Sequence, residues 1–151
     1  AYNQTNSTII IPWTNSITGM TGHQQNPTTG KNLRGEPAGK VDLEALCRAV
    51  GFRRVRVVDP NNLKEMDKAL KEELAAEEPS VIITRSPCVM LKEVPKAPPL
   101  KVDLEKCNGC SLCMRIGCPA SVSEGHVEID NTQCIGCQVC MQMCHRDALI
   151  V

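Results

Sequence analysis

Eight of the ten cysteines in this chain of 151 residues lie between residues 106 and 144. They form two triplets with the spacing C-x2-C-x2-C, and each triplet is followed by a fourth cysteine. The second triplet repeats the first at a constant offset, and the fourth cysteine repeats at an offset that is shorter by one position. Because both sets repeat one pattern, we interpret this segment as an internal duplication. The first set is Cys107, Cys110, Cys113 and Cys118, and the second is Cys134, Cys137, Cys140 and Cys144.

This spacing is typical of ferredoxins that carry two [4Fe-4S] clusters. Three thiolates on one tight loop bind three irons of a cubane, and the fourth cysteine of each set binds the other cluster. Gly109 and Gly136 stand between the first two cysteines of the triplets, where glycine tolerates a strained turn. The pattern predicts one cluster on Cys107, Cys110, Cys113 and Cys144, and another on Cys134, Cys137, Cys140 and Cys118.

Zinc and disulfides are the two other chemistries that a cysteine-rich segment can support. Zinc sites use paired C-x2-C knuckles with four ligands in all, and they do not call for two triplets that are each followed by a fourth cysteine. A disulfide framework suits a short secreted chain, and nothing in this sequence resembles a signal peptide. The spacing therefore favours iron–sulfur clusters over both alternatives.

Charge and composition argue against several classes of partner. The formal net charge is zero, and aromatic residues make up only 2% of the chain, so a nucleic-acid-binding surface is not expected. No apolar run approaches the roughly 20 residues of a membrane span. Iron–sulfur ligands and unpaired cysteines both favour a reducing interior, so we expect a cytoplasmic protein without membrane or nucleic-acid partners.

The part of the chain before the cysteines reads as a layered α/β domain with a mostly parallel sheet. Apolar runs and helical periodicity predict strands over residues 7–12, 54–58 and 80–84, and helices over 42–50 and 63–77. The glycine-rich loop over residues 13–39 follows the first strand directly, at the position where α/β sheets bind ligands.

Periodicity also predicts which side chains are buried. The first helix should bury an apolar face, and the charges of the second helix should form a solvated face. Cys47 lies on the first of these faces, and we interpret it, like Cys88, as a structural cysteine. The predicted apolar positions are Leu43, Leu46, Cys47 and Val50 in the first helix, and Leu63, Met66, Leu70 and Leu74 in the second.

The expected domain organisation is an α/β domain over residues 1–93, a proline-rich linker over 94–100 and a small α+β two-[4Fe-4S] ferredoxin-like domain over 101–151. Asp103 and Asp130 stand at equivalent positions before the first cysteine of each triplet, which supports the duplication. Because the chain starts with Ala1 in the lead-in to a strand, we expect it to be the C-terminal piece of a longer protein.

The segment NSITGMTGHQ at residues 15–24, together with the strand before it, resembles the second half of a thiamine-diphosphate-binding motif. Joined to the cysteine segment, it is similar to the C-terminal part of the indolepyruvate:ferredoxin oxidoreductase alpha subunits, within the 2-oxoacid:ferredoxin oxidoreductase family. Further similarity lies in QNPTTG at residues 25–30, VVDP at 57–60 and RSPC at 85–88. The resemblance covers nearly the whole chain.

The resemblance implies an enzyme that decarboxylates an aryl 2-oxoacid oxidatively to an acyl-CoA. Thiamine diphosphate and Mg²⁺ would carry the decarboxylation, and two [4Fe-4S] clusters would pass electrons to an external ferredoxin. The implied partners are a beta-type subunit of the same oxidoreductase, the ferredoxin, the 2-oxoacid and coenzyme A. A fragment or single subunit of such an enzyme is not expected to be active alone.

The resemblance also assigns roles to residues of the loop. Asn15 matches the family's magnesium-ligating side chain, and Ile17 matches the position whose carbonyl binds the same ion. The family's motif begins with Gly-Asp-Gly further upstream, and no such segment stands in this sequence, so binding of thiamine diphosphate is expected only where that motif is supplied. The other residues that match the cofactor-proximal loop are Thr21, Gly22, Gln24 and the candidate catalytic residue His23.

Two alternative functions stay open at this point. The chain is also consistent with a stand-alone electron carrier of the ferredoxin type, in which the α/β part is a docking module. It is equally consistent with a subunit of another 2-oxoacid:ferredoxin oxidoreductase, acting on pyruvate or branched-chain substrates. The identity of the 2-oxoacid does not follow from these residues.

Overall fold

A computed structural model describes residues 6–14, 16–20, 22–123 and 125–151 of the chain. The chain divides into two compact units, residues 1–94 and residues 95–151. We call these the sheet unit and the cysteine unit and describe each by itself. None of the helices in the described ranges is long and apolar enough to cross a membrane.

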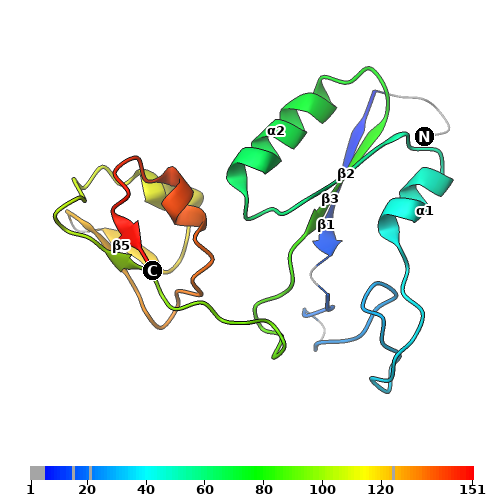
Figure 1. Cartoon of the computed structure of the whole chain (residues 1–151), viewed down its shortest axis with the longest axis horizontal. Helices are drawn as coiled ribbons and strands as arrows, with labels where there is room; N and C mark the ends of the chain where they lie inside the picture. The colour runs from blue at the N-terminus through cyan, green and yellow to red at the C-terminus, as the bar shows by residue number, and fades with distance from the viewer. Residues whose placement is uncertain (1–5, 15, 21, 124) are drawn as a thin grey trace. The chain divides into compact units, whose positions relative to one another are not determined.

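The sheet unit holds a three-stranded parallel sheet with the strand order β1-β3-β2. Right-handed connections place the two helices on opposite faces, because the chain moves across the sheet from β1 to β2 and then returns to β3 between them. Figure 1 shows α1 and α2 on either side of the strands. The elements are β1 (Thr8–Thr14), α1 (Leu43–Ala49), β2 (Arg54–Val58), α2 (Leu63–Leu74) and β3 (Ser80–Arg85). The predicted order of elements is therefore confirmed.

The central strand β3 supplies the core on both faces. Val81 and Ile83 are buried against Cys47 of α1, whereas Ile82 is buried against Ala69 of α2. This division follows from the alternation of side chains along a strand. Strand β1 pairs with β3 alone among the described strands, and its Ile10, the register partner of Ile82, is 46% exposed.

Both helices begin where the sequence predicts, at side-chain caps. Asp42 accepts hydrogen bonds from two backbone N–H groups of α1, and Asn62 accepts one from the backbone of Glu65 in α2. The predicted apolar faces are only partly correct. Leu46, Val50 and Leu74 are exposed, because a short sheet covers only part of each helix.

Glu73 contradicts the prediction that the charges of α2 are solvated. Its side chain is 2% exposed and receives hydrogen bonds from Nε and Nη2 of Arg54 at 2.8 and 3.1 Å. Arg56 lies 3.6 Å from the same carboxylate and also pairs with Glu72. Arg54 and Arg56 lie on the face of β2 that α2 covers, so this carboxylate is buried against two guanidinium groups.

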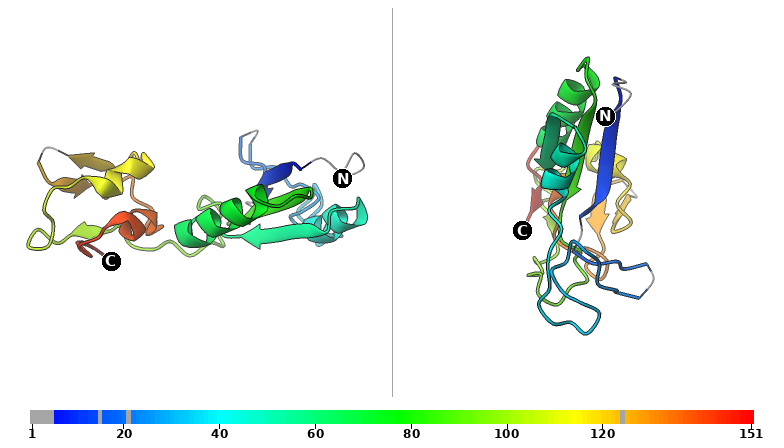
Figure 2. Two further views of the ribbon diagram at one scale, coloured as in Figure 1. Left: turned by 90° about the horizontal axis from the view of Figure 1, so that it is seen from above. Right: turned by 90° about the vertical axis from the view of Figure 1, so that its right-hand side faces the viewer.

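The cysteine unit has very little regular structure. Figure 2 shows its short strands and short helical turns. Strand β4 pairs with β7 and strand β5 pairs with β6, both antiparallel. The elements are β4 (Lys101–Val102), the 3-10 turn η1 (Leu112–Ile116), β5 (Ser121–Ser123), β6 (Val127–Ile129), the 3-10 turn η2 (Val139–Met143) and β7 (Leu149–Ile150).

The two halves of this unit repeat the same local structure. The backbone N–H of Cys107 donates to the carbonyl of Asp103, and that of Cys134 donates to the carbonyl of Asp130, both at 2.9 Å. Each aspartate carboxylate also accepts from the backbone N–H two residues later. These equivalent turns agree with the duplication inferred from the spacing.

Residues 95–100, predicted to be a linker, belong to the cysteine unit. Leu100 is 1% exposed in the core of that unit, together with Val127 and Leu149. The carbonyl of Pro98 lies directly against Gly136. The end of this segment, from Ala97 to Leu100, therefore packs within the unit, although the side chains of Pro95 and Pro98 are exposed.

Candidate functional site

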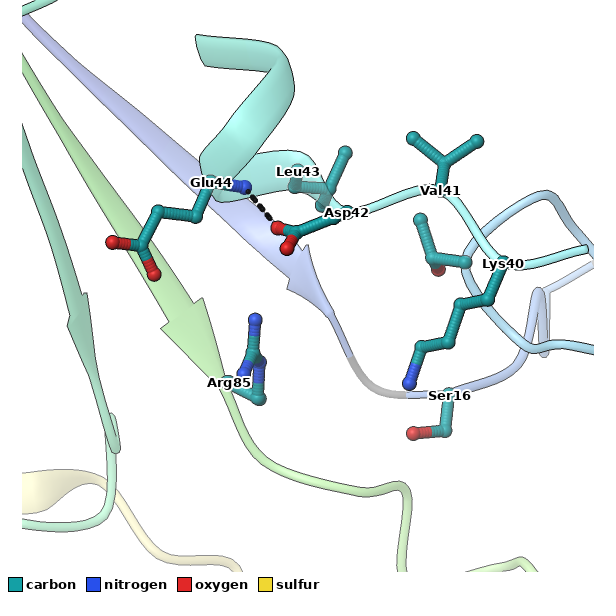
Figure 3. Close-up of a pocket in the computed structure, with 8 residues that line it drawn as sticks. Ser16, Lys40, Val41, Asp42, Leu43, Glu44 and Arg85 are labelled. Carbon is teal, nitrogen blue, oxygen red and sulfur yellow. Dashed lines mark hydrogen bonds between the residues drawn. The ribbon is translucent and has the colours of Figure 1, made fainter. Parts of the chain in front are cut away.

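A pocket of about 340 Å³ lies at the carboxyl end of the parallel sheet. Ser16 follows β1, Arg85 ends β3, and Asp42 begins α1, so three elements converge on it. Figure 3 shows Lys40 extending toward Ser16, and Arg85 at the end of β3. This is the edge at which α/β sheets bind ligands, and the sequence predicted a ligand site in the loop that leads into it.

The charges around this pocket are not equally available to a ligand. The carboxylate of Asp42 caps α1, and that of Glu44 pairs with Arg48 at 3.0 Å. Lys40 and Arg85 have no ion-pair partner within the part of the chain that the structure describes. Lys40, Arg85 and the hydroxyl of Ser16 therefore line the pocket together with the carboxylates of Asp42 and Glu44, and the two cations are the groups that could bind an anion.

The candidate loop residues that the structure describes do not line this pocket, although Ile17 directly follows Ser16, which does. Ile17 is buried, and the backbones of Thr18 and Gln24 exchange two hydrogen bonds of 3.0 Å, which closes the loop on itself. Gly22 has a φ of 100°, and His23 is exposed with a φ of 61°. Asn15 and Thr21, the other two candidates, lie outside the described residues.

Sequence reasoning missed Lys40 and Arg85 as site residues. Neither belongs to the recognised loop motif, and the two are far apart in the sequence, since they converge only where the end of β3 and the end of the loop meet α1. The place of Arg85 directly after a buried strand is a usable signal, because residues at the carboxyl ends of parallel strands share one edge.

Four cysteines line a second pocket, within the cysteine unit. Cys107, Cys110 and Cys113 of the first triplet surround it together with Cys144, the fourth cysteine of the second set. Val102, Val127 and Leu149 supply its apolar wall. The structure thus brings the first triplet together with the cysteine that the crossed pattern assigns to it.

Part of the second set also lies close to a cysteine of the first half. Cys140 is buried, and burial raises the pKa of its thiol to about 11, with further contributions from the neighbouring thiols of Cys137, Cys118 and Cys113. Burial likewise raises the pKa of Cys113, and the nearby Cys144 adds to this shift. Cysteines that are distant in sequence are therefore close in space: Cys144 lies near the first triplet, and Cys140 lies near both Cys118 and Cys113.

Glycine is required at the centre of both cysteine loops. Gly109 has a φ of 71°, and an added Cβ would lie 2.5 Å from the carbonyl oxygen of Gly125. Gly136 has a φ of 66°, and its Cβ would lie 2.5 Å from the carbonyl oxygen of Pro98. Both the left-handed backbone and the close approach exclude a side chain, as the sequence predicted for these turns.

The donor set of the cysteine pocket fits a polynuclear iron–sulfur cluster. It offers four soft thiol ligands and an apolar wall. Among the described residues, no three His, Cys, Asp or Glu side chains converge as the ligands of a single metal ion. Met114, Met141 and Met143 pack against the same core.

Comparison with known proteins matches the sheet unit to a family. Residues 1–84 match the family described as "Thiamine pyrophosphate enzyme, C-terminal TPP binding domain". The match covers more than half of the chain and ends within β3. It includes the loop that carries the candidate residues and most of the pocket at the sheet edge.

Several curated relatives share the name "Indolepyruvate oxidoreductase subunit IorA". The chain is 37% identical to the protein from Pyrococcus horikoshii over 79% of its length, and 36% identical to that from Methanothermobacter thermautotrophicus over 93%. It is 36% identical to the protein from Archaeoglobus fulgidus over 98% of its length. The chain spans 19%, 23% and 25% of these three relatives, respectively.

Proposed function

Since the chain belongs to the family of thiamine pyrophosphate enzymes through its C-terminal TPP-binding domain, we propose that it is part of a 2-oxoacid:ferredoxin oxidoreductase of the indolepyruvate type. The observation that carries this proposal is the combination, in one chain, of that domain with the pocket of four cysteines. The similarity of both units to IorA proteins favours it over a stand-alone electron carrier.

The proposed reaction is the oxidative decarboxylation of an aryl 2-oxoacid. The 2-oxoacid anion and coenzyme A give an acyl-CoA, carbon dioxide and one proton, and two electrons are released. Each of two ferredoxin molecules accepts one of these electrons, so that atoms and charge balance. When bound, thiamine diphosphate supplies stabilisation of the carbanion that decarboxylation leaves, and the clusters supply single-electron transfer.

In this proposal the sheet unit binds and orients anionic groups at the edge of its sheet. Lys40 and Arg85 contribute positive charge, and Ser16 contributes a hydroxyl group. The candidates Asn15 and Ile17 would hold Mg²⁺ through oxygen atoms, which are the ligands that this ion prefers. Gly22, His23, Gln24 and Thr21 form the neighbouring loop that contacts the cofactor or the substrate.

The cysteine unit holds the two clusters and excludes water from them. Buried Leu100, Val127 and Leu149 surround the cysteines, so the cluster environment has a low dielectric constant. The proposed ligands are Cys107, Cys110, Cys113 and Cys144 for the first cluster, and Cys134, Cys137, Cys140 and Cys118 for the second. The beta-type subunit, external ferredoxin and a reducing, cytoplasmic location belong to the same proposal.

Anaerobic iron and sulfide analysis with EPR of the dithionite-reduced chain tests the proposal directly. About eight irons and two interacting reduced cubanes are expected. The same spectra, recorded with and without thiamine diphosphate and Mg²⁺, report whether the cofactor binds to these residues. Zinc in place of iron, or no iron after anaerobic reconstitution, would overturn the proposal that the chain is part of such an oxidoreductase.

The crossed ligation has its own test. Cys118→Ala should abolish the cluster on the second triplet and leave the cluster lined by Cys107, Cys110 and Cys113 intact. Iron content should fall by about half, and the EPR signal should lose its spin–spin interaction. Loss confined to the first triplet's cluster would overturn the crossed arrangement.

A further inference from the structure

The two halves of the cysteine unit differ in the segment that follows the fourth cysteine. Equivalent hydrogen bonds mark the ends of the two segments, because Asp130 N–H donates to the carbonyl of Ala120 and Asp103 N–H donates to that of Ala148, both at 2.8 Å. One residue separates Cys118 from Ala120, whereas three separate Cys144 from Ala148. The second half therefore carries a two-residue insertion at this point.

This insertion places a cation on the wall of the first cysteine pocket. The inserted segment is His145-Arg146-Asp147, and Arg146 lines the pocket with Cys107, Cys110, Cys113 and Cys144. Arg146 is the one Lys, Arg, Asp or Glu among the described residues that line it. The corresponding segment of the first half is Pro119 alone, which carries no charge.

The backbone holds this segment folded back over its cysteine. The N–H of Ala148 donates to Sγ of Cys144 at 3.4 Å, and Asp147 has a φ of 49°, in the left-handed region that non-glycine residues rarely adopt. Within the described residues, Arg146 has no carboxylate partner. Its charge is therefore available to whatever the four cysteines bind.

We propose that Arg146 raises the reduction potential of the cluster on Cys107, Cys110, Cys113 and Cys144, and makes it the first of the two clusters to be reduced. This inference rests on the two-cluster assignment of the proposed function. Reduction adds one electron, and thus one negative charge, to a cluster that is already bound by four thiolates. A nearby guanidinium stabilises that added charge by Coulomb attraction, and Pro119, the corresponding segment of the first half, carries no charge. Arg146 is thus a tuning residue, not a ligand.

The experiment is an anaerobic redox titration of the whole chain, followed by EPR, for the parent and three variants. Arg146→Gln should change the ratio of oxidised to reduced first cluster, at a fixed potential, by about threefold to tenfold in favour of the oxidised form. That change equals about 30 to 60 mV, since a tenfold ratio is 59 mV for one electron. The higher of the two midpoint potentials should fall and the lower one should stay unchanged.

Two variants control for charge and for position. Arg146→Lys keeps the positive charge and should retain most of the parent potential. Lys101→Gln removes a cation from β4 next to Val102, whose side chain lines the pocket, and alternation points Lys101 the other way. This second variant should leave both potentials unchanged.

The same titration in a Cys118→Ala background, where only the first cluster is expected, assigns the shift to that cluster. Unchanged midpoints in Arg146→Gln, or equal shifts of both clusters, would overturn the role of Arg146. Iron and sulfide analysis separates this failure from failure of the proposed function. About eight irons with unchanged midpoints would contradict only the tuning role, whereas absence of iron from the parent chain would contradict the clusters themselves.

Discussion

The sheet unit and the cysteine unit reach a folded state by different means. In the sheet unit, β3 is a strand of six residues with five of them buried, and two helices cover its faces. The strands of the cysteine unit are two or three residues long, and two of its five core residues are the cysteines Cys113 and Cys140.

This difference predicts different sources of stability. Burial of β3 stabilises the sheet unit through ordinary apolar contacts. The cysteine unit is small and poor in backbone pairing, and domains of this size seldom supply enough apolar burial by themselves. Its fold is expected to depend on the proposed clusters, as in other small proteins that fold around metals.

Iron removal should therefore cause the largest loss of stability, and this loss should be confined to the cysteine unit. Anaerobic chelation of the clusters should accelerate amide exchange in β4–β7 by at least about a hundredfold, because two of the five core residues are then unligated thiols. Amide exchange in β1, β2 and β3 should stay unchanged. Hydrogen exchange read by mass spectrometry measures both units in one sample. Amides of the cysteine unit that stay protected after iron removal would show that this unit folds without clusters.

Ile82→Ala should have the opposite selectivity. It opens a cavity at a fully buried position of the central strand and should lower the free energy of unfolding of the sheet unit by about 3 to 4 kcal/mol. Ile10→Ala is the matched control, because Ile10 is the register partner of Ile82 and is 46% exposed. It should cost about 1 kcal/mol.

Denaturant unfolding followed by far-ultraviolet circular dichroism measures both isoleucine variants, and the EPR spectrum of the clusters should not change in either. Equal losses from the two substitutions would show that β1 is as deeply packed as β3, contrary to the structure.

Gly109→Ala should destabilise the cysteine unit in two ways, through its left-handed backbone and through contact with the carbonyl of Gly125. Gly117→Ala isolates the first cause, because Gly117 has a φ of 69° and no neighbouring atom within 4 Å of an added Cβ. We expect Gly117→Ala to lower the free energy of unfolding by about 1 kcal/mol, and Gly109→Ala to lower it by about 2 kcal/mol more. The denaturant midpoint read from cluster absorbance compares them, and equal midpoints would remove the packing argument.

Glu73→Gln should lower the stability of the sheet unit by about 2 kcal/mol, since it weakens charge-assisted hydrogen bonds to Arg54. Glu72→Gln is the control: its carboxylate is 43% exposed, and its loss should cost less than about 0.5 kcal/mol. Chemical denaturation at neutral pH distinguishes the two variants. A larger loss of stability for Glu72→Gln would show that the exposed carboxylate of Glu72 stabilises the unit more than the buried carboxylate of Glu73.

The pair of Glu73 and Arg54 also predicts how the stability of the sheet unit depends on pH. The hydrogen bond from Arg54 holds the pKa of Glu73 below its usual range, against the opposing effect of burial. A carboxyl group whose pKa is lowered on folding stabilises the folded state. This stabilisation is fully present above the pKa of glutamate in the unfolded chain, about 4.3, and is lost as the pH falls through the pKa in the folded state. Stability of the parent sheet unit should therefore decline below about pH 5, and Glu73→Gln should show a flatter profile.

Local patterns predicted most of the secondary structure. The isoleucines of β1 and the alternation in β2 correspond to strands in the structure, and both helices begin within one residue of their predicted starts. The resemblance to indolepyruvate oxidoreductase subunits is likewise confirmed by the relatives. The roles given to the candidate loop residues and the cluster ligands stay predictions.

Burial was less predictable than secondary structure. The helical period predicted apolar faces that include Leu46 and Leu74, and both side chains are exposed. The same periodicity predicted that Glu73 is solvated, because it carries no information about which strand packs against α2. Only the pairing of β2 beside β3 brings Arg54 and Arg56 under α2.

The sequence by itself determined the repeated cysteine spacing, the glycines of both loops and the order of strands and helices, because these depend on a few neighbouring residues. The tertiary structure alone decided which distant groups meet. It brought Lys40 and Arg85 to one pocket and placed Arg146 beside four cysteines. Such contacts depend on strand order and on where loops fold back, and no local pattern of residues encodes those directly.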